Sequence, residues 1–320
     1  MIDTSSADTR QEKVRIITDK LEQGIKDLMS SDRYREYLSK MSKLHRYSFS
    51  NTVLILSQCP NATMVAGFNS WKTNFGRTVN KGTHGISILA PAPFQKEIEA
   101  KIFDDNGNPV IGKDGKEVTE KRVVQVQAFK PAYVYDISQT SGKPVPRLGV
   151  DELTGTVENY DKIFEAIKEV APVDISFEKI TDGAKGYYSH TDKRIAINEG
   201  MSELQNLKTL IHETVHSMLH DNDYLKSTGK PKDRKTKEVE AESVSYTVCS
   251  YLGLDTSEYS FGYISGWAGE RKLDAVKESM ETIRKTSSDI ISAIERHLHP
   301  EMSLDIAEAQ QQTKHRAIAV

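Results

Sequence analysis

The sequence of 320 residues is poor in cysteine, has no long apolar run and lacks acids over one long stretch. Its two cysteines, Cys59 and Cys249, lie far apart and outside any metal-type pair, so both are expected to be reduced thiols. No apolar run reaches the ~18 residues of a membrane span, so no membrane partner is expected. The first residues lack the apolar core of a signal peptide, which predicts a cytoplasmic location.

Acids are missing between Glu36 and Glu97, and that stretch holds seven Lys and Arg residues. Residues 1–150 contain 22 Lys and Arg against 16 Asp and Glu, whereas residues 151–320 contain 21 against 30. A basic block of this kind has the electrostatics of a polyanion-binding surface. The alternative is a domain that is basic without such a partner. The change in charge also indicates where the chain divides.

Secondary-structure patterns predict an α+β protein of two domains. Apolar residues at helical spacing predict helices from about residue 10 to 58, and short strands with glycine-marked turns follow. The dipeptides Asn-Gly and Asp-Gly predict a protruding hairpin around residues 101–121. The predicted divisions are a first domain over 1–137, a linker over 138–150, a second domain over 151–298 and a frayed tail over 299–320.

The stretch HETVH at 212–216 places two histidines four residues apart on a helix predicted to begin near Ser202. His212 and His216 then lie one turn apart on one side of the helix, from which two imidazoles can bind one Zn²⁺ (or Mn²⁺). Glu213 lies beside them, where it can take a proton from a water molecule on the metal. His220 extends the row by one turn, but such a histidine is more often structural or solvated.

A catalytic zinc needs a third protein ligand, and the predicted helix KEVEAESVSYTVCSYLGL offers three glutamates. Glu238 and Glu242 share a helix face, while Glu240 points roughly the other way. At least one of these acids must lie at a partly buried position, where a carboxylate needs a hydrogen-bonding or metal partner. We predict Glu238 as the metal ligand and Glu242 as the acceptor of a histidine N–H. The alternative is a solvated, salt-bridged helix face.

Both halves of the chain resemble the ArdC family of antirestriction proteins. HETVH followed by EVEAESVSYTVCSYLGLD is similar to its metallopeptidase domain and, more distantly, to the ImmA and IrrE peptidases. The stretch SNTVLILSQCPNATMVAGFNSWKTNFGRTVNKGTHGISILAPAPF is similar to its N-terminal domain, which binds single-stranded DNA. The resemblance covers about residues 10–136 and 175–267. It implies a protein of mobile or conjugative elements that protects entering DNA from host restriction. Residues 221–237 and the hairpin around 101–121 depart from the family pattern.

Single-strand binding proteins combine a basic groove with aromatic side chains on which bases stack, and the acid-free stretch interleaves both kinds of residue. The residues predicted to bind single-stranded DNA are Lys43, Arg46, Asn51, Gln58, Trp71, Lys72, Arg77 and Lys81. Asn51 and Gln58 enter this set through the family resemblance, and either could instead satisfy local backbone groups. For Trp71, a place in the core is the open alternative.

The sequence therefore predicts a single-stranded-DNA-binding domain followed by a zincin-like metallopeptidase domain, with Glu213 activating water against an unknown protein or peptide substrate. Four tyrosines are candidates for stabilising the oxyanion, or for packing, namely Tyr187, Tyr188, Tyr259 and Tyr263. Two other functions stay open. One is a DNA-binding protein with a structural metal, against which Glu213 argues. The other is an ImmA-like regulatory peptidase that cleaves a repressor, against which the basic first half argues.

Overall fold

The computed structural model describes residues 9–102, 109–111, 117–145, 157, 159–181, 183–229, 231–256, 259 and 261–299. Helices and strands occur in both halves, so the predicted α+β class is confirmed. The predicted tail beyond residue 299, the end of the predicted linker and the tip of the predicted hairpin lie outside the described residues. Within the described part of the chain, no helix is long and apolar enough to cross a membrane.

Three helices open the fold, namely α1 (Arg10–Leu28), α2 (Ser31–Leu44) and α3 (Phe49–Gln58). The Thr9 hydroxyl caps α1 by accepting from the Glu12 N–H, and the Ser48 hydroxyl caps α3 by accepting from the Asn51 N–H. The apolar positions of each helix recur at helical spacing and are buried, as the sequence pattern predicts.

A small sheet follows, in which β6 (Phe129–Asp136) lies between β1 (Val65–Gly67) and β3 (Ile86–Pro91), antiparallel to both. One sheet face packs with Leu44 and Ile55 into a small second core. Beside the sheet lie a short helix and a two-stranded ladder, with a 3₁₀ turn before the second strand. These are α4 (Phe68–Thr73), β2 (Arg77–Val79), η1 (Ile137–Gln139) and β7 (Thr140–Gly142).

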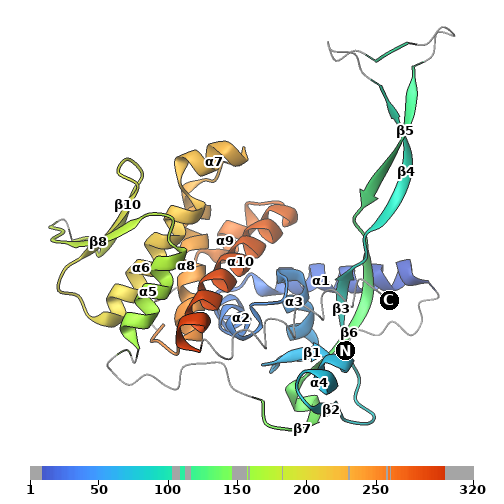
Figure 1. The fold of residues 1–320 in the computed structure, drawn as a ribbon, viewed down its shortest axis with the longest axis horizontal. Coiled ribbons are helices and arrows are strands. Elements are labelled where there is room, and N and C mark those ends of the chain that lie inside the picture. Colours follow the sequence, from blue (N-terminus) through green and yellow to red (C-terminus); the bar gives the residue numbers. More distant parts are fainter. Residues whose placement is uncertain are drawn as a thin grey trace.

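A long two-stranded arm of β4 (Phe94–Lys101) and β5 (Thr119–Val126) projects from this sheet, as Figure 1 shows. The two strands pair antiparallel along their whole length. Most arm residues are exposed, including several large apolar ones, namely Phe94, Ile98 and Val123. Of the hairpin predicted around residues 101–121, Lys101 and residues 119–121 belong to the paired strands of this arm, and the tip lies outside the described residues.

The C-terminal half places helices against one side of a small mixed sheet (Figure 1). Strand β10 pairs parallel with β8 and antiparallel with the edge strand β9. The elements are α5 (Tyr160–Val170), β8 (Asp174–Glu178), β9 (Gly186–Ser189), β10 (Arg194–Asn198), α6 (Glu203–Leu219), α7 (Asn222–Thr228), α8 (Arg234–Tyr251), α9 (Ile264–Gly269) and α10 (Leu273–Leu298).

The main hydrophobic core runs through both halves of the chain. Buried residues of α1, α2 and α3 belong to the same cluster as those of α6, α8 and α10. Polar contacts cross this interface too: the Tyr34 hydroxyl lies 2.9 Å from the Ser243 hydroxyl, and Arg35 donates to the Tyr259 carbonyl at 3.2 Å. The first three helices are thus packed on the half that carries HETVH.

Candidate metal centre

The sequence of helix α6, which carries HETVH, defines both where the helix begins and which of its faces is buried. The Ser202 hydroxyl caps the helix by accepting from the Gln205 N–H, and Glu203 places an acid in the first turn. A stripe of apolar residues fixes the inner face of the helix, namely Leu207, Leu210, Ile211 and Val215, all with 0% exposure. The two histidines then lie at the margin of the buried face.

His212, His216 and Glu238 come together at one point. The two Nε2 atoms lie 3.0 Å apart, and the Glu238 carboxylate on α8 is 3.8 Å from one and 3.9 Å from the other. Among the described residues, these three side chains form the group whose donor atoms, all within 4.8 Å of one another, could hold a metal ion. Two imidazoles and a carboxylate are a donor set that suits Zn²⁺ or Mn²⁺.

Burial keeps both histidines neutral, which leaves ring nitrogen lone pairs available to a metal. It lowers the pKa of His212 to about 4, and the nearby His220 adds to this shift. The pKa of His216 is lowered further, again mainly by burial and then by its two histidine neighbours. A neutral imidazole is the form that ligates a metal, so the protonation state fits the geometry.

Glu213 lies beside the two histidines and has the character of a general base. Burial raises its pKa to about 7, the Glu238 carboxylate adds to the rise, and a hydrogen bond from the backbone of Tyr188 opposes it. Tyr188 belongs to the edge strand β9, so the strand and the helix together position this carboxyl group. A pKa near the working pH is what proton transfer to and from water requires.

A chain of hydrogen bonds runs from His216 into the protein interior. The Nδ1 atoms of His216 and His220 lie 2.9 Å apart, and His220 Nε2 lies 2.9 Å from the Glu240 carboxylate. Glu240 has 0% exposure and also accepts from Lys232 at 2.7 Å and from Ser279 at 2.8 Å. If His216 uses Nε2 for a metal, its Nδ1–H can donate to His220, whose Nε2–H can donate to Glu240.

Here the structure differs from the sequence prediction, which assigned the histidine N–H acceptor to Glu242. That carboxylate instead accepts a hydrogen bond from the Tyr263 hydroxyl. The reason lies in the orientation of α8. The helix face that carries Glu240 is buried against the end of α6 and against α10, whereas Glu242 lies near the start of α9. The predicted burial of one acid on this helix is correct, but the buried acid is Glu240.

The other candidate tyrosines are engaged elsewhere. The Tyr187 hydroxyl donates to Glu178 at 2.7 Å, and the Tyr188 hydroxyl donates to Asp221 at 2.7 Å. The Tyr259 hydroxyl lies 4.0 Å from the Cys249 sulfur, within the core. Tyr263 alone among the four has its hydroxyl on a carboxylate of α8, the helix that also carries Glu238.

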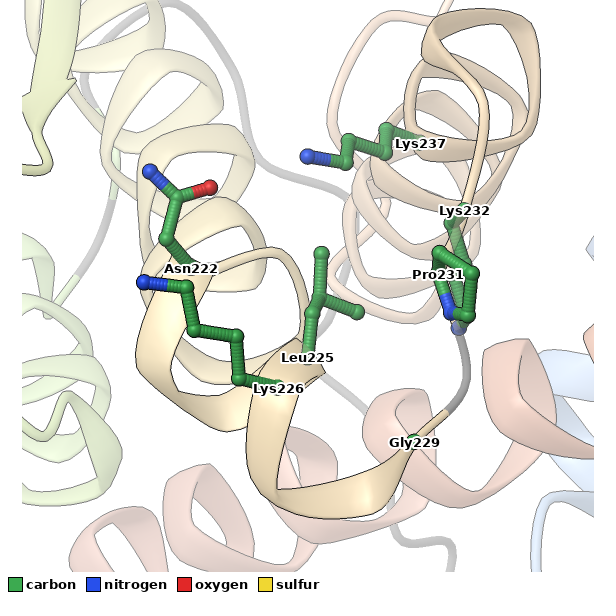
Figure 2. A pocket seen from close by; sticks show the side chains of 7 residues that line it. All are labelled: Asn222, Leu225, Lys226, Gly229, Pro231, Lys232 and Lys237. Atoms are coloured by element: carbon green, nitrogen blue, oxygen red, sulfur yellow. The ribbon is translucent and has the colours of Figure 1, made fainter.

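Helix α7, the described residues of the loop after it and Lys237 at the start of α8 line a pocket of about 400 Å³ (Figure 2). Its lining contains Lys226, Lys232 and Lys237 and no acid, although the Lys232 ammonium bonds to the Glu240 carboxylate behind it. Lys237 precedes Glu238 on α8, and after burial and the two histidine neighbours its charge is a further cause of the lowered pKa of His216. This pocket therefore presents positive charge beside the candidate ligands.

Several residues predicted to bind DNA make contacts that hold the N-terminal half together. Trp71 has 0% exposure, and its indole N–H donates to the Tyr135 carbonyl at 2.9 Å. Arg77 donates to the Thr140 hydroxyl and carbonyl and to the Lys143 carbonyl, so its guanidinium clamps β2 to β7. Trp71 thus takes the core position that the sequence left open.

Asn51 and Gln58 bond to the backbone, the second possibility that the sequence allowed for them. The Asn51 amide both donates to and accepts from the backbone of Leu89, each at 3.0 Å. The Gln58 amide makes the same paired contact with Ser87 at 2.9 and 3.0 Å. Helix α3 therefore closes the free edge of β3 with two side-chain amides, which imitate a neighbouring strand.

The four remaining predicted DNA contacts divide by exposure. Arg46 donates to the buried Glu295 carboxylate of α10 at 2.7 Å. Lys43, Lys72 and Lys81 are exposed. These three lysines lie on α2, on α4 and in the turn between β2 and β3, and they are the predicted positions whose charge faces solvent.

Comparison with known proteins identifies both halves. Residues 7–135 match the family model for the N-terminal domain of anti-restriction factor ArdC. Residues 168–257 match that of the M78 peptidases, an IrrE N-terminal-like domain. An uncharacterized protein of Bacillus anthracis is 28% identical over 319 residues, covering 90% of this chain and 52% of the relative. The chain thus spans about half the length of that relative.

Two crystal structures of the antirestriction protein ArdC from plasmid R388 are also similar. The metal-free form is 18% identical with a TM-score of 0.44, over 78% of this chain and 85% of that one. The Mn(II)-bound form is 17% identical with a TM-score of 0.44, over 80% and 86%. On the two family matches, the chain joins an ArdC-type N-terminal domain to an IrrE-like domain of the M78 peptidases, and the predicted resemblance to the ArdC family is confirmed.

Proposed function

We propose that this protein binds single-stranded DNA through its N-terminal half and hydrolyses peptides at a metal centre in its C-terminal half. We further propose that it acts as an antirestriction factor of a mobile or conjugative element. The observation that carries the peptidase assignment is the convergence of His212, His216 and Glu238 beside a carboxyl group, Glu213, whose pKa is raised to about 7.

In this mechanism His212, His216 and Glu238 would hold Zn²⁺ or Mn²⁺. The bound metal would supply a Lewis acid that lowers the pKa of water and polarises a peptide carbonyl. Glu213 accepts a proton at its carboxylate and later delivers it to the leaving amine. The chain from His216 through His220 to Glu240 fixes the orientation of the first imidazole. The Tyr263 hydroxyl is the candidate donor to the oxyanion.

The test compares Glu213→Gln and His216→Ala with the unaltered protein. Metal content is measured by mass spectrometry, and hydrolysis is followed on a mixture of peptides from a bacterial proteome. Glu213→Gln should keep about one metal per chain and lose cleavage, because an amide takes up no proton at neutral pH. His216→Ala should lose both. Cleavage that survives Glu213→Gln would exclude this mechanism.

The DNA-binding proposal rests on the exposed lysines of the acid-free stretch, Lys43, Lys72 and Lys81. Contacts to phosphates release counterions, so log K should fall against log salt by about 0.7 per contact on single strands. Three contacts predict a slope of about −2, and each Lys→Ala variant should flatten it by about 0.7. Fluorescence anisotropy of a labelled oligothymidylate, titrated at several salt concentrations, measures this slope. A binding constant that does not change with salt would exclude the assignment.

The antirestriction role rests on the ArdC-type match and is tested in cells. Conjugative transfer of an unmodified plasmid into a restriction-proficient host should increase when the recipient produces this protein. A matched restriction-deficient host should show no increase. Glu213→Gln in the same assay separates DNA protection from hydrolysis.

The IrrE-like match also favours a second candidate, a regulatory peptidase that cleaves a repressor. In that case a specific bacterial protein should disappear on expression of the unaltered chain and persist with Glu213→Gln. Quantitative proteomics of the two strains distinguishes this function from the first.

A further inference from the structure

One face of the three-stranded sheet in the N-terminal half packs in the small second core. On the opposite face Leu89 of β3 packs against the main core, and other side chains of this face stay exposed. Val134 and Ala132 of β6 point inward and pack in the small second core. Side chains alternate along a strand, so the residues between them point to the opposite face. On β6 these residues are Phe129, Pro131, Tyr133 and Tyr135. Three of the four outward positions are therefore aromatic.

Two of these side chains are half exposed. Tyr133 is 50% exposed and Phe129 51% exposed, at positions where β6 pairs with β3 alone because β1 reaches only Val134–Asp136. Phe68, at the start of α4, is 52% exposed, and its ring lies 6.0 Å from that of Tyr135 in an edge-to-face arrangement. Neighbouring large rings that stay exposed on one surface mark an interaction site more often than a single exposed ring does, so Tyr133 and Phe68 indicate a surface that receives a partner.

The backbone beneath the row is shaped to hold the rings. A Cβ atom at Gly85 would lie 2.9 Å from Tyr133 Cβ and 3.2 Å from the ring of Tyr135. Any side chain there would displace both tyrosines from their position across β3. On the other side, the buried Trp71 indole donates to the Tyr135 carbonyl and fixes the strand behind its ring.

The segments that form β1, α4 and β3 suit a polyanion, because no acid occurs between Glu36 and Glu97, and the one acid of β6, Asp136, is buried. Helix α1, which contacts β3 and β6, carries both acids and bases. The Asp136 carboxylate accepts from the backbone N–H groups of Thr63, Met64 and Ser138. Lys72 follows Phe68 by one helical turn on α4, so their side chains lie on one helix face. The loop that leads from β2 to Gly85 adds the exposed Lys81.

We propose that Tyr133 and Phe68, with Tyr135 between them, form a platform on which bases of single-stranded DNA stack. This placement rests on the proposed single-strand binding. Alternate residues of a strand are about 7 Å apart, so Tyr133 and Tyr135 can each take a different base of an extended strand. Sheets that carry exposed aromatic residues bind single strands in the same way. Bases paired in a duplex cannot reach the rings.

The first test measures binding of a labelled oligothymidylate to the full-length chain. Tyr133→Ala and Phe68→Ala should each raise the Kd between about 5-fold and 150-fold, with the salt slope unchanged. Tyr133→Phe keeps the ring and should bind like the unaltered chain. Tyr224→Ala removes a similarly exposed tyrosine, 45% exposed on α7, and should also have no effect.

A second readout locates the bases directly. An oligonucleotide that contains 5-iododeoxyuridine, irradiated in the complex, should cross-link to peptides that contain Tyr133 or Phe68. Duplex of the same length should bind more weakly, and Tyr133→Ala should reduce this preference for the single strand. Unchanged binding by Tyr133→Ala and Phe68→Ala, with a normal salt slope, would overturn the platform and leave the single-strand function standing. No binding by the unaltered chain would overturn both.

Discussion

After the candidate ligands themselves, the buried carboxylate of Glu240 is the residue on which the candidate metal centre depends most. Glu240 has 0% exposure, yet its pKa is lowered, because hydrogen bonds from His220, Lys232 and Ser279 and the charge of Lys232 outweigh the effect of burial. An ionised acid in such a place is stable only while its partners remain. Through His220 it also orients His216, so one residue links fold stability to the metal site.

Glu240→Gln should therefore weaken metal binding and the fold together. The change removes the counter-charge of Lys232, whose side chain is 21% exposed and can turn to solvent, so it should cost about 1–3 kcal/mol of unfolding free energy. The amide oxygen still accepts from His220, but loss of the negative charge at this acceptor should weaken metal binding by up to about 10-fold. Competition with a chelator, using Co²⁺ as the probe, and urea denaturation measure the two effects.

Two further variants serve as controls for this prediction. His220→Gln keeps Glu240 with its lysine, so it should retain more stability than Glu240→Gln while still weakening the metal site. Glu242→Gln alters a carboxylate that bonds to Tyr263, and it should change the metal affinity less than about threefold. Equal metal affinity in all three variants would contradict the role of the hydrogen-bonded chain.

The lowered histidine pKa also predicts a pH effect on the metal-free protein. His212 has a folded pKa of about 4 against about 6.5 when unfolded, so protons bind the unfolded state first as pH falls. The contribution of His212 to the unfolding free energy is complete above pH 6.5 and declines toward pH 4, by about 3 kcal/mol in all. Comparison with His212→Asn isolates this effect, because Glu213 titrates in both proteins. Urea denaturation at several pH values should show a steeper decline for the unaltered chain.

At the scale of elements, the sequence predicts helices and hairpins well and side-chain direction less well. Apolar spacing and the Ser202 cap predict α6, and two turn dipeptides predict the arm. Helix α7 is missed, because its few residues bury no apolar stripe. The acceptor role of Glu240 depends on the rotation of α8 against α6 and α10, which periodicity alone does not fix.

The same limit explains why the structural contacts of two predicted DNA-binding residues could not be predicted. Trp71 and Arg77 lie in a basic aromatic stretch, but their contacts are with β6 and β7, some sixty residues later in the chain. Local sequence carries no information on those contacts. The exposed position of Tyr133 on β6 could have been predicted from the sequence, because aromatic residues alternate in FKPAYVYD with residues that face the core.

The arm of β4 and β5 makes a prediction at this scale. Its strands pair with each other and are exposed along most of their length, so they add little to either core. Replacing residues 97–123 by an Asn-Gly turn should lower the unfolding free energy by less than about 1 kcal/mol. Thermal denaturation measures the change, and oligothymidylate binding should persist because Tyr133 lies outside the deleted segment. A large loss of stability would show that the arm packs on the body.

At the scale of the whole molecule, two family domains share one hydrophobic core. The composition change near residue 150 and the two family matches divide the sequence, but α1, α2 and α3 pack into the same cluster as α8 and α10. A chain cut in the predicted linker would expose that surface on both pieces. On the proposed function, DNA bound to the first half and substrate bound to the second would therefore act on helices in direct contact.

Cooperative unfolding of the two halves is the prediction that follows. Arg46 of the first half is paired at 2.7 Å with Glu295 of α10, which has 2% exposure and also accepts from the Tyr251 hydroxyl at 3.0 Å. Arg46→Ala leaves that carboxylate without its counter-charge and should cost about 3–5 kcal/mol. Lys40→Ala removes a cation of the same region that pairs on the surface with Glu36, and should cost less than about 1 kcal/mol.

The measurement is hydrogen exchange by mass spectrometry under mild denaturant, which reports each helix separately. In Arg46→Ala, protection should fall by a similar factor in α3 and in α8, although α8 carries the candidate ligand Glu238 and lies far away in the sequence. A shared core allows neither half to open alone, so one transition should describe both. Loss of protection in α3 with α8 unchanged would mean that the halves are separate folding units joined at a surface.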